Sequence, residues 1–216
     1  MDCIFSIEEI LKAAAESYRK SLSSFRPWIS TYPRNNVIAE RNISFHAARS
    51  FCELTDGYAF MEREFRQIVD GREVSLKLDS YCASPELTCL LECKVLVDAN
   101  TANEIMNDID RLNEDTARQQ VLLHVPVQPR NVHGLILVET WKSGLRDWWI
   151  STHNINIPPN LEGATERKVE AQRNGWQFKS TSVGRFEHGS PALAAGTECI
   201  WLYAIGPCMT INCDAV

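Results

Sequence analysis

Two neighbouring segments of alternating apolar and polar residues constrain the fold of this chain most strongly. Residues 73–81 and 87–97 each have the pattern of a β-strand, and Ser84-Pro85-Glu86 between them has the composition of a turn. Such a pair predicts an antiparallel hairpin in which successive side chains point to opposite faces. One face is then expected to carry Lys77 and Asp79 from the first strand, and Thr88, Leu90, Glu92 and Lys94 from the second.

Helical periodicity, capping boxes and turn residues place the other elements. The expected order is a helix after the box Ser6-Ile7-Glu8-Glu9, a helix over 36–54, strands over 60–69, 73–81 and 87–97, a helix from the box Thr101-Ala102-Asn103-Glu104, strands over 121–127 and 135–141, and a polar helix over 161–174 ended by Gly175. This predicts an α/β (α+β) fold with a mixed central sheet flanked by helices. Its core has the order α-β-β-β-α-β, with an N-terminal helix before it and a C-terminal extension after it.

The length and composition indicate one elaborated domain. With 216 residues we divide the chain into an N-terminal basic and aromatic helix and loop (1–35), a core (36–141) and a C-terminal extension packed on the core (142–216). No apolar run is long enough for a membrane span, and the N-terminus has no signal-peptide pattern, so we expect a cytoplasmic protein with no membrane partner. The eight cysteines form no C-x-x-C pair, which favours buried thiols over a zinc site.

Asp79 and Glu92 are the acids that this hairpin would bring together. If Pro85 and Glu86 form the centre of the turn, Asp79 lies opposite Glu92, and a shift of one pair makes the two diagonal neighbours. Like charges in such positions destabilise a sheet unless they are neutralised, and a divalent cation with oxygen ligands does this. Lys94 then lies beside Glu92, where it can orient or help deprotonate a water, or offset charge on the phosphate. The alternative is a surface salt bridge between Glu92 and Lys94.

Glu40 is a third candidate acid. On the helix over 36–54 it shares a stripe with Ala47 and Phe51, and an acid on an apolar stripe is costly unless it is paired or near a metal. The alternative is an acid near the helix start that interacts with the helix dipole. Its neighbour Arg41 is a candidate phosphate contact.

The N-terminal segment has the composition of a nucleic-acid contact. Aromatic rings alternate with cations there, and Arg19, Lys20 and Arg26 are the candidate phosphate contacts. Lys77, on the face predicted for Asp79, is a further candidate. The alternatives are an amphipathic helix with a solvated basic side, and an ion pair between Lys77 and Asp79.

These residues resemble a known family. Glu40 on a first helix, Asp79, the strand Leu90-Leu91-Glu92-Cys93-Lys94 and the helix that follows are similar to the PD-(D/E)XK nuclease superfamily, and most closely to resolvases of Holliday junctions and related restriction-like endonucleases. The resemblance covers about residues 36–127. Leu78 stands where the family name implies a proline before the aspartate.

The resemblance implies a restriction-endonuclease-like fold and the hydrolysis of phosphodiester bonds with Mg²⁺ or Mn²⁺. By it, Asp79, Glu92 and the Cys93 carbonyl are metal ligands, Lys94 is the catalytic lysine, and Glu40 supports a metal or a water. We therefore expect a metal-dependent nuclease that binds nucleic acid, with DNA favoured over RNA. A homodimer is expected only by analogy with other small nucleases of this kind. The alternatives are an inactive module of the same fold that binds protein or nucleic acid, and an unrelated α/β enzyme, for which we find no Gly-rich phosphate loop.

Overall fold

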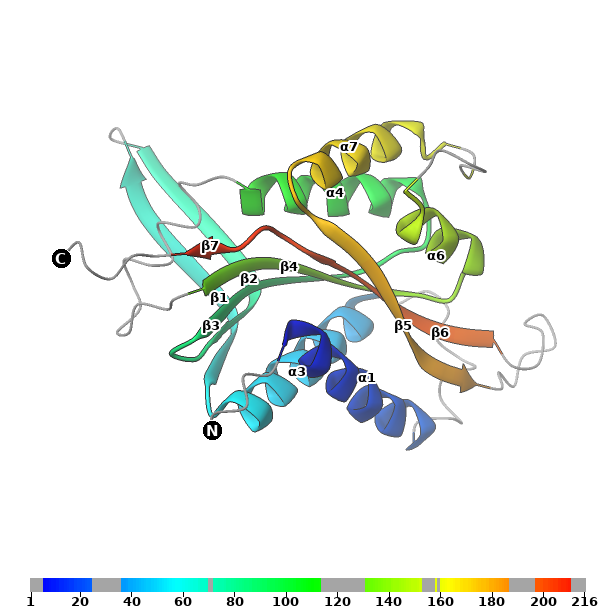
Figure 1. Cartoon of the computed structure of the whole chain (residues 1–216), viewed down its shortest axis with the longest axis horizontal. Helices are drawn as coiled ribbons and strands as arrows, with labels where there is room; N and C mark the ends of the chain where they lie inside the picture. Colours follow the sequence, from blue (N-terminus) through cyan, green and yellow to red (C-terminus); the bar gives the residue numbers. More distant parts are fainter. Residues whose placement is uncertain are drawn as a thin grey trace.

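A mixed sheet of seven strands forms the centre of the part of the chain that the structure describes (Figure 1). The computed structural model describes residues 6–24, 36–69, 72–113, 131–152, 158, 160–186 and 197–210. The strands are β1 (Tyr58–Val69), β2 (Arg72–Ala83), β3 (Leu87–Val95), β4 (Asn131–Thr140), β5 (Gln177–Phe186), β6 (Thr197–Ile205) and β7 (Met209–Thr210). They lie in the order β1-β2-β3-β4-β6-β5, and β7 pairs with β4. β3 and β4 run parallel, and the other neighbours run antiparallel.

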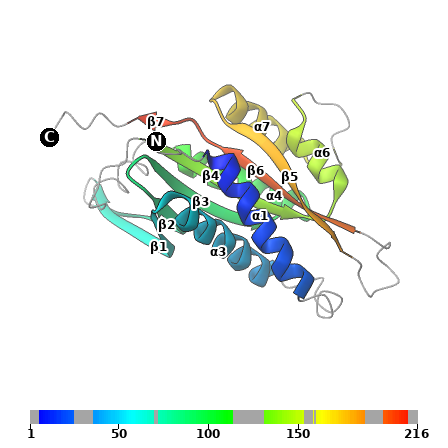
Figure 2. The same ribbon diagram turned by 60° about the horizontal axis from the view of Figure 1, so that its bottom comes forward.

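Helices cover both faces of the sheet (Figures 1 and 2). On one face lie α1 (Ile7–Ser24) and α3 (Asn36–Thr55), and on the other lie α4 (Ala99–Asn113), α6 (Ser143–Ile150) and α7 (Glu162–Arg173). Each face has its own apolar cluster, and β3 contributes to both: Leu91 and Cys93 pack toward α1 and α3, whereas Leu90 packs toward α4. A strand buried on both faces explains its nearly continuous apolar sequence.

The predicted mixed α/β class and its α-β-β-β-α-β order are present as α3, β1, β2, β3, α4 and β4. Helix α4 makes the connection between the parallel strands β3 and β4, because parallel neighbours need a crossover. The strand predicted over 121–127 lies outside the described residues. Residues after 141 form α6, α7 and the last three strands, and β6 pairs directly with β4.

Local capping interactions set the ends of three helices. The predicted box at Ser6 is confirmed, because the Ser6 N–H donates to Glu9 at 2.8 Å and the Glu9 N–H donates to the Ser6 hydroxyl at 3.3 Å. The helix predicted to start from a box at Thr101 begins earlier: Asp98 is its cap, since its carboxylate accepts the Thr101 N–H at 2.9 Å. Gly175, with φ of 92°, follows the end of α7 as predicted.

The predicted turn between β2 and β3 is confirmed, and it sets the register. The Ser84 N–H donates to the Leu87 carbonyl at 2.8 Å, and the ladder runs from the pair Ala83 and Thr88 to the pair Ser80 and Leu91. This is the register in which Asp79 comes opposite Glu92. The ladder between β2 and β3 ends there, while β1 and β2 continue to pair as far as Val69 and Arg72. The far half of the hairpin formed by β1 and β2 therefore separates from β3 (Figure 1).

The strict alternation predicted through residues 73–81 is wrong at the point where the strands separate. Leu78 and Tyr81 are three residues apart, yet both lie in the apolar cluster on the α4 side. The ladder between β1 and β2 keeps the same register before and after Glu62 and Asp79, but these two residues are not paired in it. Glu62 has a positive φ of 51°. The distortion lets the Asp79 carboxylate turn toward β3.

Candidate functional site

Two carboxylates bind the main chain of β3 just beyond its last pairing with β2. Asp79 Oδ2 accepts the Cys93 N–H at 2.8 Å, and Glu40 Oε1, from α3, accepts the Val95 N–H at 3.4 Å. The N–H and C=O of one strand residue point to the same edge, so the Cys93 carbonyl also faces the side of Asp79. Asp79 and Glu40 thus flank the strand segment that carries Lys94.

Glu92 and Lys94 project from β3 toward α4, where two further charged residues meet them. Arg111 Nη2 donates to Glu92 Oε1 at 2.6 Å and to Asp108 Oδ1 at 2.9 Å. Lys94 Nζ lies 3.5 Å from Asp108 Oδ2. The side chains are 4% exposed for Glu92, 14% for Asp108 and 24% for Lys94. The surface salt bridge between Glu92 and Lys94, considered as an alternative, is not formed; each pairs with α4.

Burial dominates the electrostatics of these acids. It raises the pKa of Glu92 to about 8, although the Arg111 guanidinium acts against this rise. Burial also raises the pKa of Asp108 against the opposing charges of Lys94 and Arg111, and that of Glu40 against Lys94. Burial acts to lower the pKa of Lys94, but the carboxylates led by Asp108 outweigh it and raise that pKa. Lys94 therefore carries a full positive charge at neutral pH.

The donor set is suited to a hard divalent cation, with one competing contact. Asp79, Glu92 and the Cys93 carbonyl supply oxygen atoms, which Mg²⁺ and Mn²⁺ prefer, and a magnesium site often needs only one or two carboxylates with waters and a substrate phosphate. Within the described residues no three His, Cys, Asp or Glu side chains form a group that could hold a metal ion by themselves. Arg111 donates to Glu92 Oε1 and would compete with a metal for that oxygen. A metal bound through Glu92 Oε1 would require this bridge to shift.

Sequence reasoning missed Asp108 and Arg111. A signal for Asp108 was available, because it lies three residues after Ile105 and four before Leu112, on the buried stripe of α4. This is the same argument that singled out Glu40. Arg111 had no comparable signal, because a single arginine in the last turn of a helix is ordinary.

The predicted phosphate contacts lie in different parts of the fold. Arg19 and Lys20 lie on α1 beside Glu16, and the Arg19 side chain lies against Gly184 of β5, at the opposite edge of the sheet from β1. Arg41 follows Glu40 on α3, is exposed, and lies 3.3 Å from Glu62, which stands level with Asp79 between β1 and β2.

Lys77 is exposed, and its Cα pairs across the ladder with that of Glu64 on β1. Arg26 lies outside the described residues.

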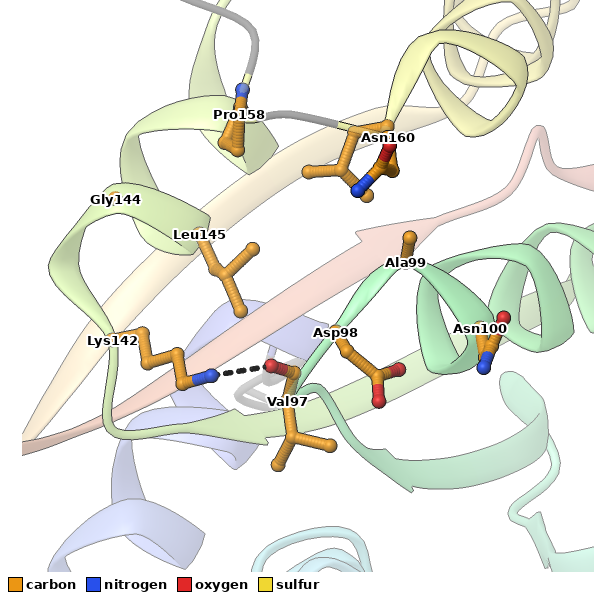
Figure 3. A pocket seen from close by; sticks show the side chains of 10 residues that line it. Val97, Asp98, Ala99, Asn100, Lys142, Gly144, Leu145, Pro158 and Asn160 are labelled. Carbon is orange, nitrogen blue, oxygen red and sulfur yellow. Dashed lines mark hydrogen bonds between the residues drawn. The ribbon is translucent and has the colours of Figure 1, made fainter.

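A cavity of about 640 Å³ lies elsewhere, at the ends of β3 and β4 (Figure 3). It is lined by residues 97–100, by residues 142, 144 and 145 at the start of α6, and by residues 158, 160 and 161. The Lys142 ammonium donates to the Val97 carbonyl at 2.6 Å across it. None of the predicted site residues lines this cavity, so we place the candidate site at the acids of β2 and β3.

Comparison with protein-family models, curated proteins and solved structures found no match to this chain. In the described part of the chain, no helix combines the length and apolar character needed to cross a membrane.

Proposed function

We propose that this protein is a divalent-metal-dependent nuclease that hydrolyses phosphodiester bonds in DNA or RNA. The observation that carries the proposal is the meeting of Asp79, Glu92, Lys94 and Glu40 where β2 and β3 separate. The order α3, β1, β2, β3, α4, β4 and the resemblance to the PD-(D/E)XK superfamily support it.

In this proposal Asp79, Glu92 and the Cys93 carbonyl hold Mg²⁺ or Mn²⁺, and Glu40 supports the site through the β3 main chain. When bound, such a cation polarises a phosphoryl oxygen and lowers the pKa of a bound water. The raised pKa of Lys94 keeps its ammonium protonated, so its role is to stabilise negative charge on the phosphate and not to accept a proton. Asp79 also fixes the position of Cys93 through its hydrogen bond.

A second candidate function is an inactive module of the same fold that binds a protein or a nucleic acid. The bridge from Arg111 to Glu92 and Asp108 favours it, because this cation already neutralises the buried acids from within the chain. A site balanced in this way has no electrostatic need for a metal.

The two candidates are separated by metal binding and cleavage measured on the same proteins. Mn²⁺ binding by calorimetry should be lost in both Asp79→Ala and Glu92→Gln, and retained in Glu53→Gln, a control on the exposed ion pair of α3. The wild type should then cut branched, duplex or single-stranded substrates with Mg²⁺, and both site variants should be inactive. Full cleavage by either variant would refute the assignment, and a wild type that neither binds metal nor cuts would favour the inactive module.

A further inference from the structure

Asp108 is an acid on the side of α4 that packs against the sheet. The helix is already held there by five buried apolar residues, Ala102, Ile105, Met106, Ile109 and Leu112. A buried ion pair is seldom more stabilising than apolar residues of similar size, because both charges lose their hydration. Packing of α4 therefore does not account for an acid at this position.

The two oxygen atoms of Asp108 have different surroundings. Oδ1 accepts a hydrogen bond from Arg111 at 2.9 Å. Oδ2 is buried, accepts no hydrogen bond, and faces the Lys94 ammonium at 3.5 Å. This leaves one carboxylate oxygen directed at the cation of the candidate site.

The other acids around Lys94 are engaged elsewhere. Asp79 binds the Cys93 N–H, Glu40 binds the Val95 N–H, and Glu92 binds Arg111. Within the described residues, Asp108 is the acid that lies at ion-pair distance from Lys94.

We propose that Asp108 is a positioning residue whose carboxylate holds the Lys94 ammonium in place beside Glu92. The inference rests on the proposed nuclease function and adds α4 to the site. A lysine has a long flexible stem, and a cation contributes most to a reaction when it is already fixed where charge develops. Misplacement of a catalytic group by about 1 Å can lower a rate on the order of 100-fold.

The test uses the full chain with Mg²⁺ and a fluorescent oligonucleotide in the form that the wild type cuts. Asp108→Asn should lower kcat about 10- to 100-fold with KM unchanged, and Asp108→Glu should recover part of the loss. The double variant Asp108→Asn with Lys94→Met should be no slower than Lys94→Met alone, because Asp108 acts through Lys94. The control is Asp110→Asn, which removes an acid of the same helix that pairs with Arg167. Wild-type kcat in Asp108→Asn, or losses that multiply in the double variant, would overturn the proposal.

Urea unfolding tests the contact between Asp108 and Lys94 without an activity assay. The four proteins compared are the wild type, Asp108→Asn, Lys94→Met and the double variant. If Asp108 holds Lys94, the two substitutions should be coupled by about fivefold or more in the unfolding equilibrium constant. Independent effects would overturn the positioning role even if the wild type is a nuclease. Coupling in a wild type that cuts nothing would refute the nuclease and support the contact.

Discussion

Asp79 and Cys93 are joined by a hydrogen bond of 2.8 Å from the Cys93 N–H to the Asp79 carboxylate, at the point where β2 stops pairing with β3. The Asp79 carboxylate thus takes the place of a main-chain carbonyl of β2 as the acceptor for the β3 N–H that follows the end of the ladder. The sheet can open there without leaving the Cys93 N–H unsatisfied, and the acid is fixed beside Glu92.

We expect Asp79→Asn to separate this structural role from the chemical one. The amide oxygen can still accept the Cys93 N–H, so the free energy of unfolding should fall by only about 1 kcal/mol or less. The melting temperature should then fall by only a few degrees. Cleavage should fall by on the order of 100-fold or more, because the variant lacks the charge for a cation. Thermal unfolding and a cleavage assay with Mg²⁺ measure the two effects. Asp79→Leu, which removes both roles, should also lose stability, and an active Asp79→Asn would contradict the site.

The raised pKa of Glu92 predicts a pH dependence of stability. Burial raises this pKa from 4.5 to about 8, so the folded state binds the proton more tightly than the unfolded state does. The stabilisation of the folded state by the protonated Glu92 side chain is fully present below pH 4.5 and is lost as the pH rises to about 8. Across this window the free energy of unfolding should fall by roughly 2–5 kcal/mol through this group.

Urea unfolding of the wild type and Glu92→Gln at pH 5 and pH 8 tests this prediction. The wild type should lose more stability than the variant between the two pH values, because a glutamine has no proton to release. Equal losses would show that Glu92 titrates normally in the folded protein.

Arg111 should stabilise the folded protein most at pH values at which Glu92 is ionised. The guanidinium donates to Glu92 at 2.6 Å, and a hydrogen bond between charged groups contributes about 1.5–3 kcal/mol. Arg111→Met should therefore lower the free energy of unfolding by about 1–3 kcal/mol at pH 9 and by less at pH 6, where Glu92 is protonated. Arg173→Met, at an exposed position in the last turn of α7, is the control. A loss that is larger at pH 6 would contradict the pairing.

On the opposite face of the sheet, Tyr18 anchors α1 to a buried acid. Its hydroxyl donates to Glu139 at 2.6 Å, and Trp141 donates to the other oxygen of that carboxylate at 2.7 Å. Tyr18→Phe should lower the free energy of unfolding by about 1–3 kcal/mol, because Glu139 loses a donor in a buried position. The same substitution in a Glu139→Gln background should cost less, and chemical denaturation of the four proteins gives the coupling. Equal costs in both backgrounds would argue against this anchor.

Lys168, on α7, is a buried cation that caps the C-terminal end of α6. Its ammonium donates to the main-chain carbonyls of Trp148, Trp149 and Ser151, and its side chain lies near the rings of Trp148 and Phe178. Lys168→Ala should lower the free energy of unfolding by about 2–4 kcal/mol, because it leaves these carbonyls and a cavity behind. Urea unfolding measures the loss, with the exposed Arg173→Ala as control. A loss comparable to that of the control would refute this role.

The sequence by itself determined the features that depend on short stretches of chain. The turn at Ser84-Pro85-Glu86 and the box at Ser6 depend on hydrogen bonds between residues close in sequence, so they were predicted correctly. The register that follows from the turn brought Asp79 level with Glu92. The start of α4 was missed by a few residues, because Asp98 and Thr101 both have side chains that can cap a helix.

The tertiary structure decided which charges pair. Packing of α4 across the sheet brings Asp108 and Arg111 to Lys94 and Glu92, and the distortion at Glu62 and Asp79 reverses the alternation that the sequence suggested. Long-range pairs of this kind depend on how helices and strands dock, and docking is governed by apolar surfaces distributed over the whole chain. The acids of the strands could therefore be identified from the sequence, whereas their partners on α4 emerge only when the two faces of the sheet are covered.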